Sequence, residues 1–442
     1  MTAGAIPSSA QIREAGERTR RGPTTKEVLE GYRQRSWRFL ADLQTSSGQE
    51  FVVGRREGPY IWSLEGDRRV LECGNSGGVH SLGHRNPEIV ATLEDALEHL
   101  DAGMWTMPTP EALVLGDAIA GSAPTPQLNR SVPTLSSSIS IDLAIMFAFR
   151  VTGRGKILAF RHGYHGSSGL AALATGSDAE GWFDHYRLPR DQSLFFPTYG
   201  DLAGAERCVS DECAAVIAEP MNYETFAPAP PDFLPGLAEV CRRRGVLFIM
   251  DETRTGLGRS GKTWMTSHYE VAPDMLIVGK GLGGGMYPAS ALLATESIYD
   301  ACMNTERWGY MASMAGSPIG ALVATKVVEI ASRPSLLANV QNLGEALEIR
   351  FAEIAERYPQ VFSRGSVLGA IATLGLANQK IVSSIRRELF ARNVLCHSVS
   401  EIAPRVVKFF PCLTSGEEVV EELTQALSDV GESYARGRAR SQ

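Results

Sequence analysis

Apolar and polar positions follow two alternating patterns over the central part of the chain. Between residues 85 and 330, segments with apolar residues at helical spacing alternate with short, β-branched apolar runs. Such runs are typical of buried strands in a parallel sheet, because both faces of that sheet are covered. The alternation therefore predicts an α/β fold with a mostly parallel, doubly wound sheet. The predicted strands are KILAF, AAVIAEP, VLFIMD, MLIVGK and SALLAT.

The two ends of the chain show different patterns. Residues 26–46 carry apolar residues at helical spacing, which predicts a helix. Residues 50–73 alternate around turns at Gly58-Pro59 and Glu65-Gly66-Asp67, which predicts a small antiparallel sheet. Beyond residue 330 a long helical segment, LLANVQNLGEALEIRFAEIAERY, leads into a smaller α+β segment. We therefore expect three parts: an N-terminal segment (1–84), a large domain (85–330) and a C-terminal small domain (331–442).

The composition excludes several classes of protein. The 442 residues carry a formal net charge of −7 with no long basic run, which argues against a nucleic-acid surface. No apolar run reaches the length of a membrane span, and the first residues lack the apolar core of a signal peptide. The seven cysteines are scattered without a CxxC pair, which favours reduced thiols in a cytoplasm and no metal site.

Two charged residues at the ends of predicted strands carry the main chemical signal. Asp251 ends the run VLFIMD, and Lys280 ends the run MLIVGK. Charged groups at the ends of buried strands are costly to desolvate unless a partner compensates them. A pyridoxal phosphate (PLP) ring compensates both, because the amine forms a Schiff base with its aldehyde and the carboxylate keeps its ring nitrogen protonated. The structural alternative is that Asp251 caps a helix and Lys280 reaches solvent from a strand end.

Several motifs surround these two residues. The pattern D-E-x-x-T-G-x-G-R-x-G runs from Asp251 to Gly261, and Lys280 lies within G-K-G-x-G-G-G. Further motifs are Gly83-His84-Arg85-Asn86-Pro87, Tyr164-His165-Gly166 and Glu219-Pro220. Together they cover the chain from about residue 50 to 430, and they resemble the class III aminotransferase family of fold-type I PLP enzymes, including its glutamate-1-semialdehyde aminomutase-like branch. Each motif alone is weak, whereas the combination is specific.

The resemblance implies a fold-type I PLP-transferase, with a large domain and a small α+β domain built from both chain ends. In that family Lys280 would form the Schiff base and shuttle a proton, and Asp251 would pair with the ring nitrogen. Tyr164 and Thr253 would lie on the two faces of the ring. Arg254 lies where relatives place a polar residue near the ring hydroxyl. The resemblance also assigns two further residues to the cofactor site: His165 and Glu219.

A serine-rich run before the helical segment IDLAIMFAFRV is the candidate phosphate site. Hydroxyl and N–H groups at a helix N-terminus bind phosphate. Aligned with the family's S-G-[ST]-E-A loop, Ser137, Ser138 and Ile139 lie at the phosphate. The run departs from that loop, because Ser138 replaces a glycine, Ile139 a hydroxyl residue and Ser140 a glutamate. We expect weaker PLP binding, since each lost hydrogen bond to a charged acceptor is worth about 1.5–3 kcal/mol; the alternative is a serine-rich helix cap.

The substrate side of the predicted site departs from the family as well. Many relatives carry an arginine where this chain has Lys408, and a lysine lacks the bidentate fork that grips a carboxylate. Three explanations remain open: Lys408 pairs with Glu219, the substrate lacks an α-carboxylate, or another cation such as Arg55 serves. Trp105 and Asn75-Ser76-Gly77 occupy segments that line the substrate entrance in relatives.

The predicted function is transfer of an amino group between an amine or amino acid and a carbonyl compound, through a Schiff base on Lys280. A PLP-dependent aminomutase, epimerase or decarboxylase on the same fold remains an alternative, as does a degenerate scaffold that binds PLP poorly. The resemblance also implies a homodimer with shared active sites, in which Ser313 of a neighbouring subunit contacts the phosphate. We expect a cytoplasmic, biosynthetic enzyme that acts on small molecules, with no metal, nucleic-acid or membrane partner.

Overall fold

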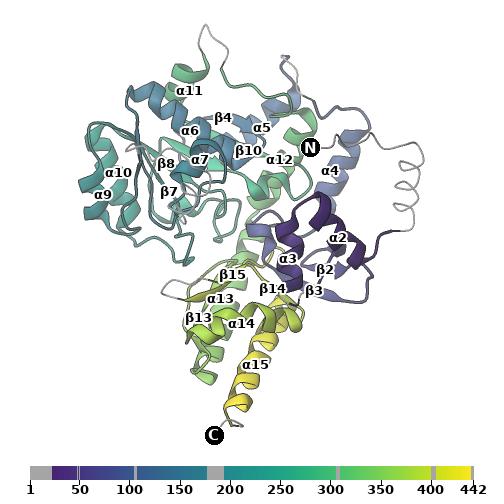
Figure 1. Ribbon diagram of the computed structural model, residues 1–442. Helices are drawn as coiled ribbons and strands as arrows, with labels where there is room; N and C mark the ends of the chain where they lie inside the picture. Colours follow the sequence, from purple (N-terminus) through teal and green to yellow (C-terminus); the bar gives the residue numbers. More distant parts are fainter. Residues whose placement is uncertain are drawn as a thin grey trace, which may run out of the picture.

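A seven-stranded sheet with helices on both faces forms the centre of the larger part of the molecule (Figure 1). The computed structural model describes residues 22–46, 48, 50–103, 107–176, 194–304, 309–399 and 405–439. The strands follow one another across this sheet in the order β4 (Arg130–Thr134), β10 (Ser290–Ala294), β9 (Met275–Val278), β8 (Leu247–Asp251), β7 (Cys213–Ala218), β5 (Lys156–Leu158) and β6 (Leu194–Phe195). Strand β10 is antiparallel to both of its neighbours, and the remaining pairs are parallel.

Alternate residues of the central strands enter two separate cores, one on each face of the sheet. In β7, Val216 and Ala218 belong to the first core, whereas Ala215 and Ile217 belong to the second. Because both faces are covered, these strands are apolar at nearly every position. The first core includes residues of helices α4 (Pro87–Leu97), α5 (Pro110–Ser122), α9 (Leu202–Cys208), α10 (Phe233–Arg244) and α12 (Pro318–Ala331), and the second includes residues of α6 (Ser137–Thr152), α7 (Gly169–Ala174) and α11 (Glu296–Met303).

This architecture confirms the predicted α/β class and the mostly parallel, doubly wound sheet. All five predicted strands are present as β5, β7, β8, β9 and β10. Sequence patterns missed β4, which contains Pro133 and lies at the edge of the sheet. A proline is tolerated there because an edge position does not require every N–H group.

A second sheet joins the two ends of the chain. The predicted antiparallel sheet of residues 50–73 is confirmed as β1 (Val53–Glu57), β2 (Tyr60–Ser63) and β3 (Arg69–Cys73). Strand β14 (Val394–Cys396) adds to β3 in parallel, so a segment near the C-terminus completes it. A third sheet contains β11 (Phe362–Ser363), β12 (Val367–Leu368), β13 (Ile371–Leu376), β15 (Ser398–Val399) and β16 (Val406–Phe409). This pairing supports a small domain built from both ends; the division at residues 84 and 330 remains a prediction.

Helices cover these smaller sheets in the lower part of Figure 1. The predicted helix at 26–46 is divided into α2 (Thr25–Arg35) and α3 (Arg38–Ser46). Thr24 caps α2 through a reciprocal pair of hydrogen bonds with Glu27. The predicted long helix is confirmed as α13 (Pro334–Arg357). The other helices of the described residues are α14 (Gln379–Ala391), α15 (Glu417–Ala439) and the short 3₁₀ segments η1 (Asn75–Gly77), η2 (Met265–His268) and η3 (Lys280–Gly283).

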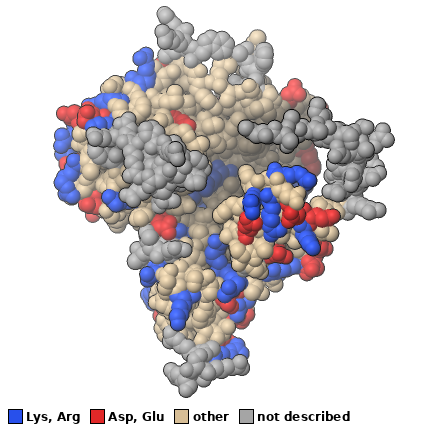
Figure 2. Space-filling model, viewed as in Figure 1, with Lys and Arg blue, Asp and Glu red and all other residues tan. Residues whose placement is uncertain are grey.

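The described residues carry charges of both signs on the face shown in Figure 2. No helix in the described part of the chain combines the length and the apolarity that crossing a membrane requires. On the face drawn in Figure 2, acidic and basic side chains are interspersed, and a hollow separates the two parts of the molecule.

Candidate active site

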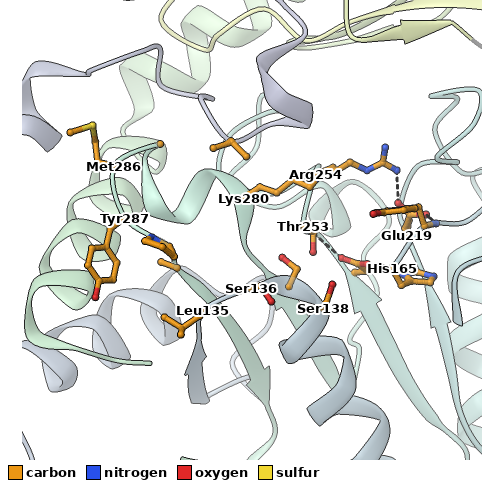
Figure 3. A pocket seen from close by; sticks show the side chains of 18 residues that line it. Leu135, Ser136, Ser138, His165, Glu219, Thr253, Arg254, Lys280, Met286 and Tyr287 are labelled. Atoms are coloured by element: carbon orange, nitrogen blue, oxygen red, sulfur yellow. Dashed lines mark hydrogen bonds and ion pairs between the residues drawn. The ribbon is translucent and has the colours of Figure 1, made fainter. Parts of the chain in front are cut away.

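A cavity of about 510 Å³ lies at the edge where the parallel strands end (Figure 3). Ligands in doubly wound sheets bind beyond the carboxyl ends of the strands, so this is the expected location. Eight predicted site residues line the cavity: Ser137, Ser138, Tyr164, His165, Glu219, Asp251, Thr253 and Lys280. Two others do not line it: Ile139 and Ser313. The structure thus brings together residues from segments more than 140 positions apart.

Asp251 is the last residue of β8 and is only 4% exposed. Its Oδ2 accepts a hydrogen bond from Nδ1 of His165 at 2.8 Å, and its Oδ1 accepts one from the N–H of Thr253 at 3.0 Å. Burial alone would raise the pKa of Asp251, but the hydrogen bond and charge of His165, together with Thr253, lower it below its ordinary value. The site therefore holds a carboxylate anion, which is what a protonated ring nitrogen needs.

Lys280 begins η3, just beyond the end of β9, and its backbone has φ 45°. A methyl group at Gly77 would lie in tight contact with the Lys280 amine, at 3.0 Å, and Gly77 has φ 68°, which favours glycine. Burial lowers the pKa of Lys280 to about 7, and the nearby charge of Arg254 contributes in the same direction. An amine that is neutral near pH 7 is a nucleophile and a base, as Schiff-base chemistry requires.

The lowered pKa makes a testable prediction about cofactor uptake. The rate at which the apo protein takes up PLP should rise about tenfold per pH unit below pH 7 and level off above it, because only the neutral amine attacks an aldehyde. Stopped-flow measurement of the visible absorbance checks this. Butylamine in place of the protein is the control, since its ordinary pKa keeps its rate rising through the whole range. A protein rate that also rises up to pH 10 would contradict the lowered pKa of Lys280.

The start of α6 forms another part of the cavity wall. Ser136 caps the helix, and its Oγ accepts a hydrogen bond from the N–H of Ile139. Ser137 and Ser138 follow as the first helical residues and line the cavity, so their N–H groups lie at the positive end of the helix dipole. A Cβ at Gly279 would lie 2.0 Å from the hydroxyl oxygen of Ser137. Gly279 therefore lets the phosphate loop contact the backbone beside Lys280.

The departures of this loop from the family pattern have structural explanations. Ser138 is helical rather than left-handed, so the missing glycine causes no backbone strain. Ile139 packs against the second core instead of lining the cavity, which places its side chain away from a phosphate. Ser140 is fully buried, and its hydroxyl bonds to those of Thr134 at 2.7 Å and Ser290 at 2.9 Å. A serine there connects the helix to β4 and β10.

Ser140→Ala should therefore reduce stability rather than cofactor binding. We expect the free energy of unfolding to fall by about 1–2 kcal/mol, because two buried hydrogen bonds are lost while both partners keep another one. Urea unfolding of the apo protein measures this loss. Ser138→Ala is the matched control, since its hydroxyl has no hydrogen-bond partner among the described residues and faces the cavity. Equal unfolding midpoints for the two variants would contradict a stabilising connection from Ser140 to β4 and β10.

Glu219 holds two neighbours in place at the same edge. Its Oε1 accepts a hydrogen bond from Nη2 of Arg254 at 2.7 Å, and its Oε2 accepts one from the N–H of Tyr164 at 3.1 Å. Tyr223 stacks on Tyr164 with ring centroids 5.0 Å apart and lies 4.1 Å from the Arg254 guanidinium carbon. Sequence reasoning missed Tyr223, because its position three residues after Glu219-Pro220 carries no motif.

The structure corrects one explanation for Lys408 and excludes Arg55 as the other cation. Lys408 does not pair with Glu219; its ammonium lies 3.8 Å from Glu224. Burial lowers the pKa of Lys408 to about 8, with Glu224 opposing the shift. Arg55 is exposed, pairs with Glu57 and stacks on Trp62, so it lies outside the cavity.

The remaining candidates lie at different distances from the cavity. Gly77, in η1, lies beside the Lys280 side chain. Asn75 in the same turn is buried, and its Oδ1 has no hydrogen-bond partner within the described residues. Ser313 is exposed between Met311 and Met314, which are also exposed. Trp105 lies outside the described residues.

These residues fit PLP at each of its functional groups. The amine of Lys280 suits an aldehyde, the Asp251 carboxylate suits a ring nitrogen, and the start of α6 suits a phosphate. Two buried polar atoms of the cavity wall, Oγ1 of Thr253 and Nη1 of Arg254, have no hydrogen-bond partner within the described part of the chain. Buried polar atoms are almost always paired, so both are expected to find partners on a ligand.

Solved structures show the same fold. The ornithine aminotransferase from Toxoplasma gondii has a TM-score of 0.83 and 20% sequence identity, over 98% of this chain and 100% of that chain. An S-selective transaminase from an Arthrobacter species has a TM-score of 0.80 and 20% identity, over 94% of this chain and 100% of that chain. These neighbours confirm the fold-type I architecture.

Sequence comparisons extend the likeness from fold to family. An uncharacterized aminotransferase from Archaeoglobus fulgidus is 34% identical over 93% of this chain and 95% of its own length. The putrescine aminotransferase of Pectobacterium atrosepticum is 28% identical, over 89% of this chain and 85% of that protein. The family model described as aminotransferase class-III matches residues 44–430. The chain therefore belongs to the class III aminotransferases, with pyridoxal 5′-phosphate as cofactor and amino-group transfer as reaction.

Proposed function

We propose that this enzyme moves an amino group from a small amine or amino acid to a carbonyl compound, with PLP held covalently by Lys280. One observation is the main support for assigning these roles to Lys280 and Asp251. Lys280 and Asp251 line the same cavity from the ends of adjacent strands, β9 and β8. The arrangement also argues against a degenerate scaffold, because the amine, the carboxylate and the helix N-terminus all face one space.

Each residue has a role that follows from its surroundings. When bound, PLP supplies an electron sink next to the reacting carbon. Lys280 has a pKa of about 7, so its Nζ can accept a proton from the reacting carbon and then donate that proton to a neighbouring atom. Asp251 stays anionic through its hydrogen bond with His165, and it would keep the ring nitrogen of bound PLP protonated. Tyr164 would cover the ring, and the N–H groups of Ser137 and Ser138 would hold the phosphate.

Reconstitution with PLP tests this proposal. The purified protein should gain visible absorbance, and borohydride should remove that absorbance and fix the cofactor to the peptide that contains Lys280. Donor amines are then screened by loss of absorbance, and carbonyl acceptors by its return. Mass spectrometry should detect one ketone or aldehyde for each amino group removed. A rearranged, epimerised or decarboxylated product without net carbonyl formation would favour the alternative reactions, and a protein that takes up no PLP would favour a scaffold.

We also propose a cytoplasmic homodimer with shared sites. The free state of all seven cysteines supports a reducing compartment. Exposed apolar side chains support an interface: Met311 and Met314 flank Ser313, Met107 precedes α5, and Leu113 lies on α5. Mixed dimers test the shared site. Combining Lys280→Ala subunits with Ser313→Ala subunits should restore one complete site and its PLP affinity, whereas independent sites would show no recovery.

A further inference from the structure

His397 lies beside the turn that contacts Lys280, although no motif of the predicted site includes it. It follows β14, in the part of the chain beyond residue 330. Strand β14 pairs in parallel with β3, which places Cys396 opposite Cys73. The residues that follow these two strands consequently lie close together, and a Cβ at Gly74 would lie 3.4 Å from the Cα of His397. The pairing of the two ends of the chain thus places His397 against η1.

His397 and Lys280 border the same small space. A Cβ at Gly77 would lie 3.0 Å from the Lys280 amine and 3.4 Å from Cε1 of the His397 imidazole. This space is open because residue 77 is a glycine. The imidazole therefore forms part of the wall around the amine.

The imidazole is held in place by its surroundings. The backbone N–H of His397 donates to the carbonyl of Lys408 at 2.9 Å. The ring stacks on that of Phe226, with centroids 5.6 Å apart, and its centroid lies 5.3 Å from that of Phe410. Both phenylalanines are fully buried, and the backbone of Gly74 forms a hydrogen bond with the imidazole. The ring is thus a fixed part of the wall.

The turn between His397 and Lys280 is strained. Asn75 and Ser76 have φ 52° and 43°, in the left-handed region that non-glycine residues rarely adopt. Such a conformation persists only where surrounding contacts hold it. The side chain of Glu72 accepts a hydrogen bond from the N–H of Asn75, and His397 lies against the same turn. These contacts keep the turn in position beside the amine.

The amine of Lys280 is neutral near pH 7 mainly because it is shielded from water. Burial is the largest cause of its lowered pKa. Of the charged groups around it, Arg254 and Arg259 also lower the pKa, whereas Asp251 and Glu219 oppose the shift. A residue that closes the wall beside the amine therefore controls the reactivity of Lys280.

His397 excludes water from this space without adding a charge. Burial and the cations Arg254, Lys280 and Lys408 lower the pKa of the imidazole to about 3. Near pH 7 the ring is consequently neutral, so it neither repels a Lys280 ammonium nor forms an ion pair with it. Its effect on the amine is to keep solvent away.

We propose that His397 is a positioning residue of this active site, which shields the Lys280 amine from water beside Gly77 and so keeps that amine neutral and nucleophilic. The inference rests on the proposed function, because it concerns the amine that binds PLP. It also makes the pairing of β14 with β3 a condition for the reactivity of Lys280, because this pairing places His397.

Uptake of PLP by the apo protein, followed from pH 5.5 to 10 by stopped-flow absorbance, tests the proposal. His397→Ala opens the wall to water, which should raise the pKa of Lys280 toward its ordinary value by about one unit. At pH 6 the variant should take up PLP about tenfold more slowly than the wild type, because fewer of its amines are neutral. On the plateau at high pH the two rates should be similar. General damage to the site would instead slow uptake at every pH.

Two further variants serve as controls. His397→Phe keeps a neutral aromatic ring beside Phe226 and Phe410, so its uptake rate should level off near the same pH as that of the wild type. Leu395→Ala removes a side chain of similar size from the same strand, but Leu395 packs against a separate cluster that contains Ile61 and Phe390. This variant should also keep the wild-type pH profile, even if its melting temperature falls.

The outcomes separate the role of His397 from the proposed function. A folded His397→Ala protein whose uptake rate levels off at the same pH as that of the wild type, or an equal shift in Leu395→Ala, would overturn the role of His397 and leave the proposed function intact. If His397→Ala does not fold, His397→Asn replaces it, with a shift in the same direction expected. A wild-type protein that takes up no PLP would overturn the proposed function, and the role of His397 with it.

Discussion

Lys280→Ala is expected to abolish amino transfer, with a loss of at least about 10⁴-fold, and to remove the borohydride-sensitive visible absorbance. The reason is that this one amine, with its pKa near 7, serves as the covalent anchor and as the base. Alanine leaves the cavity wall otherwise intact, since the neighbouring Asp251 keeps its bonds to His165 and Thr253. The measurement is the rate of carbonyl product formation at saturating PLP.

Lys408→Ala provides the control for this result. Lys408 is also a buried lysine with a lowered pKa, but it lies on β16 and does not line the cavity. The control should retain visible absorbance that borohydride bleaches, and mass spectrometry should still find the cofactor on Lys280. If Lys280→Ala still binds PLP covalently, or if only Lys408→Ala loses covalent PLP, then Lys280 is not the lysine that forms the Schiff base.

Asp251→Asn is expected to reduce the rate of amino transfer by about 10²- to 10³-fold while PLP remains bound. Asparagine has nearly the same shape but no negative charge, so it cannot stabilise a protonated ring nitrogen. The burial of Asp251 and its bond to His165 at 2.8 Å leave no solvent to replace the lost charge. Steady-state rates, together with the visible spectrum of the loaded variant, separate loss of chemistry from loss of cofactor.

The neighbouring carboxylate offers a matched control for this variant. Glu252 is 1% exposed and accepts hydrogen bonds from the N–H groups of Met265 and Thr266, outside the cavity. Glu252→Gln should lower the melting temperature but leave the rate per loaded subunit near that of the wild type. A wild-type rate in Asp251→Asn, or an equal fall in both variants, would contradict a specific role for Asp251.

The part of the site that sequence could predict is the part that depends on local signals. Asp251 and Lys280 each follow a buried apolar run, so their placement at one edge follows from the parallel sheet alone. The location of the serines at the start of α6 could be predicted because the apolar pattern of that helix marks where it begins. The structure added detail there by separating Ser137 and Ser138, which line the cavity, from Ile139, which enters the core.

The part that sequence could not predict depends on register and on side-chain reach. Glu219 and Glu224 lie close to one another in the chain and far from Lys408, so the sequence does not tell which of them pairs with it; the folded structure shows that Glu224 does. The pairing of Arg254 with Glu219 crosses from the end of β8 to the end of β7. Ser290 became part of the Ser140 network because β10 runs antiparallel, a direction that its apolar pattern does not reveal.

The close approach at Gly279 has a consequence for ligand choice. The Ser137 hydroxyl occupies the space that any larger residue at 279 would need, so the start of α6 packs directly against the backbone beside Lys280. Under the proposed function, this packing would set the distance between the groups that hold the phosphate and the aldehyde, and the site would select a cofactor by its length. Analogues that are one methylene longer or shorter should fit one of these groups at the expense of the other, however well their rings match.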